Sequence, residues 1–168
     1  MKKILSLAIT VAFIFGFSVC QAISPNRMNA GGIYIFQSLS EVESIYGKPV
    51  SVKTEQVNAG FRHTNTIYEY GRYGTTFKII FVGNKVMHIR VAGNNGIATS
   101  DGIKVGTPLS EVKRILGPGK EITNGGSVFG SHQISYRQDE LRDPVRMIIF
   151  YIKNNKVDSY IVDSGVDI

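Results

Sequence analysis

The sequence predicts an α+β fold built from two tandem copies of one unit, each a short helix followed by an antiparallel sheet, with the helices on one sheet face. Three observations lead to this fold class. A nine-residue pattern occurs twice, its apolar residues recur at helical spacing, and apolar runs separated by short turns follow each occurrence. The 168-residue chain is 43% apolar and 19% charged, a composition typical of globular proteins.

The first 22 residues are predicted to be a secretory signal peptide. Met1-Lys2-Lys3 is a short basic start, residues 4–19 are almost wholly apolar, and Cys20-Gln21-Ala22 suits cleavage after Ala22. The apolar stretch is short for a membrane anchor, which needs about 20 such residues. Lipoprotein processing at Cys20 is the alternative, and it would anchor the protein by a lipid. We therefore expect a periplasmic or secreted protein, or one that is lipid-anchored at Cys20.

Cleavage after Ala22 would change both the charge and the chemistry of the chain. It would leave 17 Lys and Arg against 13 Asp and Glu, a net charge of +4, and no cysteine. The excess lies in residues 23–100, with eight basic and four acidic side chains, whereas residues 101–168 carry nine of each. We expect an exported or envelope protein with an acidic surface as the partner, no nucleic acid, and no transmembrane segment after cleavage.

The internal duplication defines the predicted domains. Residues 39–47 read LSEVESIYG, and residues 109–117 read LSEVKRILG, 70 positions later. Apolar runs at 79–82 and 148–151 follow in the same order, and so do the turns at 83–86 and 154–157. The predicted organisation is a signal peptide (1–22), an N-terminal segment (23–31), repeat 1 (32–91), a linker (92–101), repeat 2 (102–163) and a tail (164–168).

Each copy begins with a helix that has recognisable start and stop signals. Ser38 and Glu41 have capping-box spacing, whereas Thr107 is expected to cap the second helix with Pro108 at its first position. Gly47 and Gly117 suit the residue that ends a helix. One apolar face is predicted on each helix, made of Leu39, Val42, Ile45 and Tyr46 in the first and Leu109, Val112, Ile115 and Leu116 in the second.

Each helix is followed by strands. Residues 77–82 and 86–91 are predicted to form one hairpin, and residues 146–152 and 157–163 another. Alternation in the strand at 86–91 places three residues, Met87, Ile89 and Val91, toward the helix. It places Val86, His88 and Arg90 on the other, partly solvated face. Two copies side by side would extend the sheet and share its burial.

The pattern over Gly102–Pro118 resembles tandem-repeat modules of the beta-lactamase inhibitory protein type, and it is similar to outer-membrane assembly lipoproteins of the SmpA/OmlA kind. The resemblance covers residues 32–91 and 102–163. It implies an α+β fold that grips another protein through its open sheet face and loops. Inhibitors of that type staple their repeats with disulfides, whereas the predicted mature chain has no cysteine.

The sequence lacks the usual patterns of catalysis. His63, His88 and His132 are separated along the chain, so no metal site is predicted. The chain has no H-E-x-x-H, P-loop or G-x-S-x-G motif. We therefore expect no enzyme, no catalytic residues and no cofactor. The remaining enzymatic alternative is a hydrolase whose carboxylates meet only in the fold.

Aromatic and basic residues gather in the first copy instead. Tyr and Arg are enriched in protein-binding hot spots because they combine contact area with hydrogen-bonding ends. The predicted partner-binding patch is Tyr68, Tyr70, Arg72, Tyr73, His88 and Arg90. The alternative interpretation places Tyr68 and Tyr70 in the core as ordinary strand residues.

These features predict an exported, non-catalytic protein-binding module, inhibitor-like or assembly-like, that acts through an exposed sheet face and loops. The alternative is a periplasmic carrier or sensor of a small ligand or envelope polymer in the groove between the copies. A broad, shallow face would favour a protein partner, and a deep, closed, apolar pocket would favour a ligand.

Overall fold

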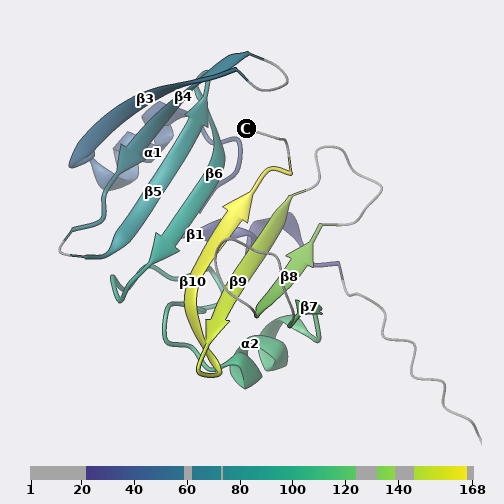
Figure 1. The fold of residues 1–168 in the computed structure, drawn as a ribbon. Helices are drawn as coiled ribbons and strands as arrows, with labels where there is room; N and C mark the ends of the chain where they lie inside the picture. Colours follow the sequence, from purple (N-terminus) through teal and green to yellow (C-terminus); the bar gives the residue numbers. More distant parts are fainter. Residues whose placement is uncertain (1–21, 59–61, 73, 124–131, 139–145, 166–168) are drawn as a thin grey trace, which may run out of the picture.

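An eight-stranded antiparallel sheet with strand order β3-β4-β5-β6-β10-β9-β8-β7 dominates the structure, a computed structural model (Figure 1). It describes residues 22–165 except 59–61, 73, 124–131 and 139–145, so the predicted signal peptide, apart from Ala22, lies outside the described residues. The helices are α1 (Leu39–Tyr46), α2 (Leu109–Leu116) and the short 3-10 helix η1 (Pro25–Arg27). The strands are β1 (Asn29–Ala30), β2 (Ile33–Tyr34), β3 (Ser51–Val57), β4 (His63–Glu69), β5 (Thr76–Val82), β6 (Lys85–Ala92), β7 (Lys120–Ile122), β8 (Gln133–Arg137), β9 (Met147–Lys153) and β10 (Lys156–Asp163). The predicted α+β class is confirmed.

The two helices pack on the same face of the sheet, which we call the helix face. A tyrosine from this face reaches the end of each helix: the Tyr70 hydroxyl donates to the Gly47 carbonyl at 3.0 Å, and the Tyr136 hydroxyl donates to the Gly117 carbonyl at 2.9 Å. In Figure 1, α1 lies behind the first half of the sheet. The opposite face, turned toward the viewer, is the open face.

The helix starts follow the sequence signals in α1 and depart from them in α2. The Ser38 hydroxyl accepts from the Glu41 amide, and the Glu41 carboxylate accepts from the Ser38 amide, so the capping box is confirmed. In α2 the N-cap is Pro108, whose carbonyl accepts the first helical bond, and the Thr107 hydroxyl accepts from the Lys104 amide. The prediction for Thr107 was wrong because a local turn uses its side chain.

Replacing Ser38 with alanine is expected to lower the free energy of unfolding by about 1 kcal/mol, because an N-cap hydroxyl satisfies an otherwise unpaired amide. Urea denaturation followed by circular dichroism measures the change. Ser110→Ala makes the same substitution at an exposed position inside α2 and is expected to leave stability almost unchanged. Equal losses in the two variants would show that Ser38 does not act as a cap.

The predicted apolar helix face holds for α2 and only in part for α1. Leu109, Val112 and Leu116 are buried in α2, but Val42 alone is fully buried in α1, and Ile45 is 52% exposed. Tyr46 packs inward, with its ring 5.0 Å from that of Phe77. Successive helical residues point about 100° apart, so turning Tyr46 inward turns Ile45 outward.

A β-bulge in β6 makes the order of its buried and exposed side chains differ from the predicted alternation. The pairing of β5 with β6 shifts by one residue at Met87, so Val86 joins the core with 0% exposure and Met87 does not. His88 and Arg90 stay on the open face. The pairing of β9 with β10 shifts in the same way at Asp158, 71 residues later. An extra residue in one strand reverses which side chains face the core.

The two halves of the sheet join where β6 pairs with β10. Arg90 lies opposite Ile161, a residue 71 positions later, and the pairs on either side keep the same symmetric relation. The backbone bond from Leu39 N to Asn84 O (3.2 Å) has a counterpart from Leu109 N to Asn155 O (2.9 Å). The bounds of β5 and β9 also differ by 71 positions, so residues 79–82 correspond to residues 150–153. The expected match of residues 79–82 with 148–151 was therefore two positions out of register.

Candidate functional site

The structure divides the predicted binding patch between the two faces of the sheet. Tyr68 lies opposite Ile79, which lies opposite Ile89, and this row points into the core. Tyr68 is only 8% exposed, and its hydroxyl donates to the Glu43 carboxylate at 3.0 Å. His88 and Arg90 lie on the open face. Because paired strand residues point the same way, Tyr68 and Arg90 are on opposite faces and do not form one surface.

Tyr70 is also a structural residue of the helix face. Its ring packs against Tyr46 and Phe77, with centroid separations of 5.4 and 5.9 Å. Burial raises the pKa of Tyr70 to about 12. Arg72, by contrast, is exposed and lines a pocket next to Tyr70 on this face. Tyr73 lies outside the described residues.

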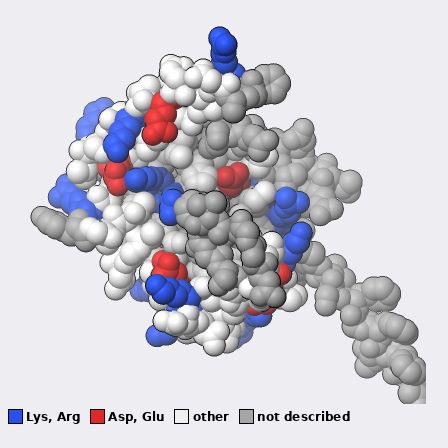
Figure 2. All heavy atoms as spheres, in the orientation of Figure 1, with Lys and Arg blue, Asp and Glu red and all other residues white. Residues whose placement is uncertain are grey.

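The open face of the first half carries a pocket of about 180 Å³ that is lined in part by charged residues. Its floor includes Ile67 and Ile80, and charged residues surround them. These charged residues are Lys53, Glu55, Glu69, Lys78 and Arg90, and His88 lies beside them. The Lys78 ammonium lies 3.7 Å from the Glu69 carboxylate. Basic and acidic side chains are mixed over this part of the surface (Figure 2).

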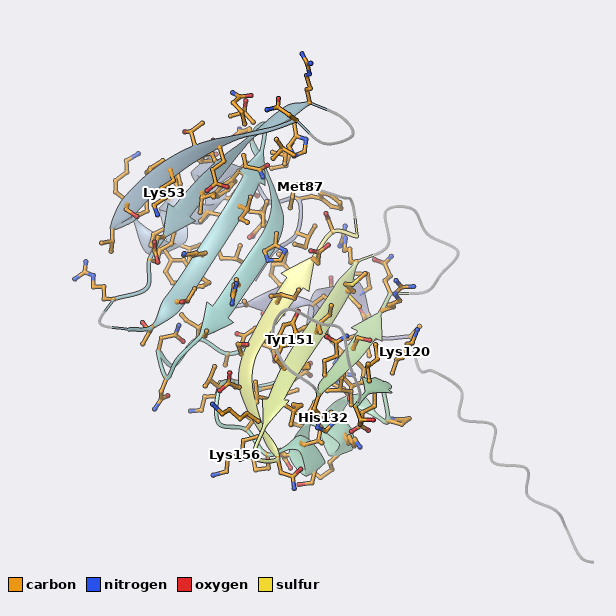
Figure 3. All side chains as sticks on the ribbon, viewed as in Figure 1. Lys53, Met87, Lys120, His132, Tyr151 and Lys156 are labelled. Carbon is orange, nitrogen blue, oxygen red and sulfur yellow. The ribbon has the colours of Figure 1, made fainter. Side chains whose placement is uncertain are left out.

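A side-chain hydrogen bond links the two half-sheets on the open face. His88 Nδ1 lies 2.7 Å from Asp163 Oδ2, across the junction of β6 and β10. The other oxygen of Asp163 accepts from the Gly165 amide at 2.6 Å. Tyr151 of β9 lies near this contact (Figure 3). Burial raises the pKa of its hydroxyl, and the charges of Arg90 and Asp163 act on that pKa in opposite directions.

Of the predicted patch, His88 and Arg90 lie on the open face, beside residues that the sequence did not indicate. Lys53 and Lys78 come from β3 and β5, and Tyr151 and Asp163 come from the second half. Alternation along β5 could have indicated Lys78, because it separates the buried residues Phe77 and Ile79. No local pattern indicates which residues of β10 would face β6.

The described part of the open face carries both cationic and anionic side chains. Within the part of the chain that the structure describes, no three His, Cys, Asp or Glu side chains form a group that could hold a metal ion. His132 pairs with Glu121, which also binds the Lys113 ammonium, and these contacts hold the pKa of the Glu121 carboxyl below its ordinary value. None of the described helices has the length and apolar content to span a bilayer.

The class that this geometry defines is an α+β protein with two helices on one face of a long antiparallel sheet and a charged open face. The sequence matches no family model and no curated protein. Among solved structures, the fold is similar to a cysteine-rich secretory protein from Staphylococcus aureus, with TM-score 0.51 and 13% identity, over 83% of this chain and 46% of that one. The chain thus spans less than half the length of that protein.

A candidate beta-lactamase inhibitor protein from Streptococcus mutans is a more distant structural neighbour. Its TM-score is 0.34 at 13% identity, and the match covers 74% of this chain and 80% of that one. At this distance it carries no argument about function, and the likeness to the Staphylococcus aureus protein concerns the fold alone.

Proposed function

We propose that the chain is an exported, non-catalytic protein-binding module that holds its partner on the open face of the sheet. The observation that carries this proposal is the charged face opposite the helices, where Lys53, Lys78 and Arg90 lie beside Glu55 and Glu69. Interspersed charges of both signs suit recognition of a complementary surface, since they favour one docking register and penalise others. The excess of cations selects an acidic partner.

The ligand-carrier alternative has less support. A small-molecule site is a cleft of about 300–1,000 Å³ that encloses most of its ligand. The pocket on the open face is smaller than this, about 180 Å³, and the pocket beside Tyr70, about 430 Å³, is within the range, but neither is lined by residues of the second half and so neither lies between the halves. Five of the nine residues that line the open-face pocket are Lys, Arg or Glu, which suits a charged protein surface better than a wholly apolar ligand.

Duplication of one ancestral unit is part of the proposal, with the boundaries predicted from the sequence for repeat 1 (32–91) and repeat 2 (102–163). It is supported by the repeated LSEV pattern, the bulges 71 positions apart, and the pairing of Arg90 with Ile161 at the centre of the junction. A self-complementary pairing of two equal surfaces is how identical subunits associate in a symmetric dimer. Fusion of two such units would make the eight-stranded sheet.

Export is the remaining part of the proposal, and it is supported by the pattern of residues 1–22. Mass spectrometry of protein expressed from the 168-residue chain tests it. A mass corresponding to a chain that begins at Ile23 is expected. A lipid-modified chain that begins at Cys20 would select the anchored alternative, and an uncleaved chain would contradict export.

Reversing two open-face charges is expected to reduce partner capture by at least about tenfold, because each lost charge pair becomes a repulsion. The variant is Lys53→Glu with Lys78→Glu, and capture from an envelope extract is quantified by mass spectrometry at two salt concentrations. The matched control, Lys104→Glu with Lys156→Glu, makes the same change in net charge at exposed positions elsewhere. Equal losses in both variants would show that only the net charge of the protein matters. If neither variant lost partner capture, the open face would not be the binding surface.

A further inference from the structure

The outer edge of β3 is the longer of the two edges of the described eight-stranded sheet. β3 (Ser51–Val57) is the last strand of the sheet order, and it borders the first half on the side away from the second half (Figure 1). Residues 52–56 are exposed. The strand at the other end of the sheet, β7, is only three residues long. A long edge presents a row of backbone amides and carbonyls that can pair with another strand.

The hydrogen bonds of β4 show which backbone groups of β3 point outward. The Tyr70 amide donates to the Phe77 carbonyl toward β5, and the Glu69 carbonyl accepts from the Val50 amide on the β3 side, both at 2.8 Å. Successive strand residues bond to opposite neighbours, so Ser51, which lies opposite Glu69, directs its backbone groups to β4. The residues of β3 that direct their amides and carbonyls to the outer edge are therefore Val52, Thr54 and Gln56.

The side chains of β3 alternate between the two faces of the sheet. Lys53 and Glu55 line the pocket on the open face, whereas Val52 lies opposite the buried Tyr68 on the helix face. Among the described residues, no ion pair involves Lys53 or Glu55. The border of the sheet thus presents one cation and one anion, two positions apart on the same face, that the described chain does not pair.

One antiparallel register of two β3 edges satisfies both the backbone and the charges. In a symmetric pair the two strands are related by a two-fold axis, and outward-facing residues lie opposite one another. An axis at Thr54 places Lys53 of each copy opposite Glu55 of the other, and residues 51–57 overlap completely. An axis at Lys53 or at Glu55 would place like charges directly opposite each other, which is unfavourable. Axes nearer either end of the strand would leave little overlap.

Exposed apolar side chains accompany this edge. The large apolar side chains that are more than a third exposed in the described chain are Ile45, Val50, Val52 and Ile122. Three of these four lie in α1, in β3 or just before β3, and Val52 is on the strand itself. With the axis at Thr54, Val52 lies opposite the second copy's Gln56 on the helix face. Pairing would therefore bury part of the exposed surface of Val52.

We propose that two copies of this chain associate through their β3 edges, antiparallel and about a two-fold axis at Thr54. Backbone hydrogen bonds between the outward-facing residues join the strands, and two pairs of Lys53 with Glu55 on the open face select the register. A second copy is the occupant because the edge is complementary to itself: each charge of β3 meets its opposite in another β3. The inference does not rest on the proposed function.

The proposal predicts a reversible dimer in sedimentation velocity experiments on protein produced from the 168-residue chain. A Kd of about 10–100 μM is expected for a contact limited to one strand edge. Thr54→Pro removes the central outward amide but none of the amides that bond to β4, so it should raise the Kd by at least about tenfold. Thermal unfolding followed by circular dichroism shows that this variant keeps its fold.

Charge reversal tests the register without changing the backbone. Lys53→Glu alone, or Glu55→Lys alone, turns both cross-strand pairs of the dimer into repulsions, so each variant should raise the Kd by at least about tenfold. An equimolar mixture of the two variants should dimerise again, because every pair in the mixed dimer joins opposite charges. Lys120→Glu makes the same reversal at an exposed position on β7, the other edge strand, and should leave the Kd unchanged.

Four results would overturn the proposal. The first is a protein that stays monomeric up to about 1 mM, well above the expected Kd. The others are a dimer that Thr54→Pro leaves intact, a mixture of the two charge variants that stays monomeric, and a loss in Lys120→Glu equal to that in Lys53→Glu. These measurements use the purified protein alone, and Thr54→Pro keeps every charge of the open face, so they are independent of partner capture.

Discussion

Replacing Val112 with aspartate is expected to lower the free energy of unfolding by at least about 3 kcal/mol, because the new carboxylate would be buried without a cation to pair with it. Val112 is 0% exposed and lies at the centre of the buried side of α2. Urea denaturation followed by circular dichroism measures the loss. The effect should begin in the second half, where α2 packs.

The control for this variant is Val52→Asp. Val52 is 54% exposed on the edge strand β3, so the same substitution there should cost less than about 1 kcal/mol. If Val112→Asp were as stable as Val52→Asp, the packing of α2 on the sheet would be wrong. Two separate unfolding transitions in the Val112 variant would show that the first half remains folded when the second does not.

Replacing Tyr160 with alanine is expected to cost about 3–5 kcal/mol, because it removes a large side chain from the core and leaves a cavity. Tyr160 is 0% exposed, lies opposite Val91 where the half-sheets join, and has its ring centroid 5.6 Å from that of Phe150. Its hydroxyl donates to the Ile97 carbonyl at 3.2 Å, and burial raises its pKa far above the ordinary value. Thermal and urea denaturation measure the loss.

Tyr160→Phe separates packing from hydrogen bonding at this position. It keeps the ring and removes only the bond to Ile97, so a loss of about 1 kcal/mol is expected. If phenylalanine were as costly as alanine, the bond to the linker rather than the packed ring would hold the two halves together. If alanine were tolerated, the junction would not be part of the core.

The parts of the fold that depend on neighbours in the chain could be predicted. The capping box of Ser38 and Glu41 involves residues three positions apart, and each hairpin pairs strands that follow one another. The expected helices and the four main strands of these hairpins all appear in the structure. Thr107 does not cap α2 because its hydroxyl accepts from the Lys104 amide and not from an amide of the helix. The sequence does not show which of these two local hydrogen bonds is the stronger.

The candidate site was predicted less well, because a face is made by several strands. The extra residue at Met87 forms a bulge that reverses the alternation of β6. The composition of the strand does not indicate where such a bulge lies. Tyr68 and Arg90 both belong to first-half strands, but the register from β4 through β5 to β6 puts them on opposite faces. Hot-spot composition considers residue types without their positions, so it could not indicate which of these residues share one surface.

The sequence by itself determined the elements, the duplicated pattern and the apolar side of α2, because these follow from the spacing of residues within about ten positions of one another. Only the tertiary structure decided that β6 meets β10, that His88 reaches Asp163, and that the Ile23 amide reaches the Arg137 carbonyl. These contacts join residues about 70 positions apart or more, and packing of the whole sheet selects them rather than any local preference.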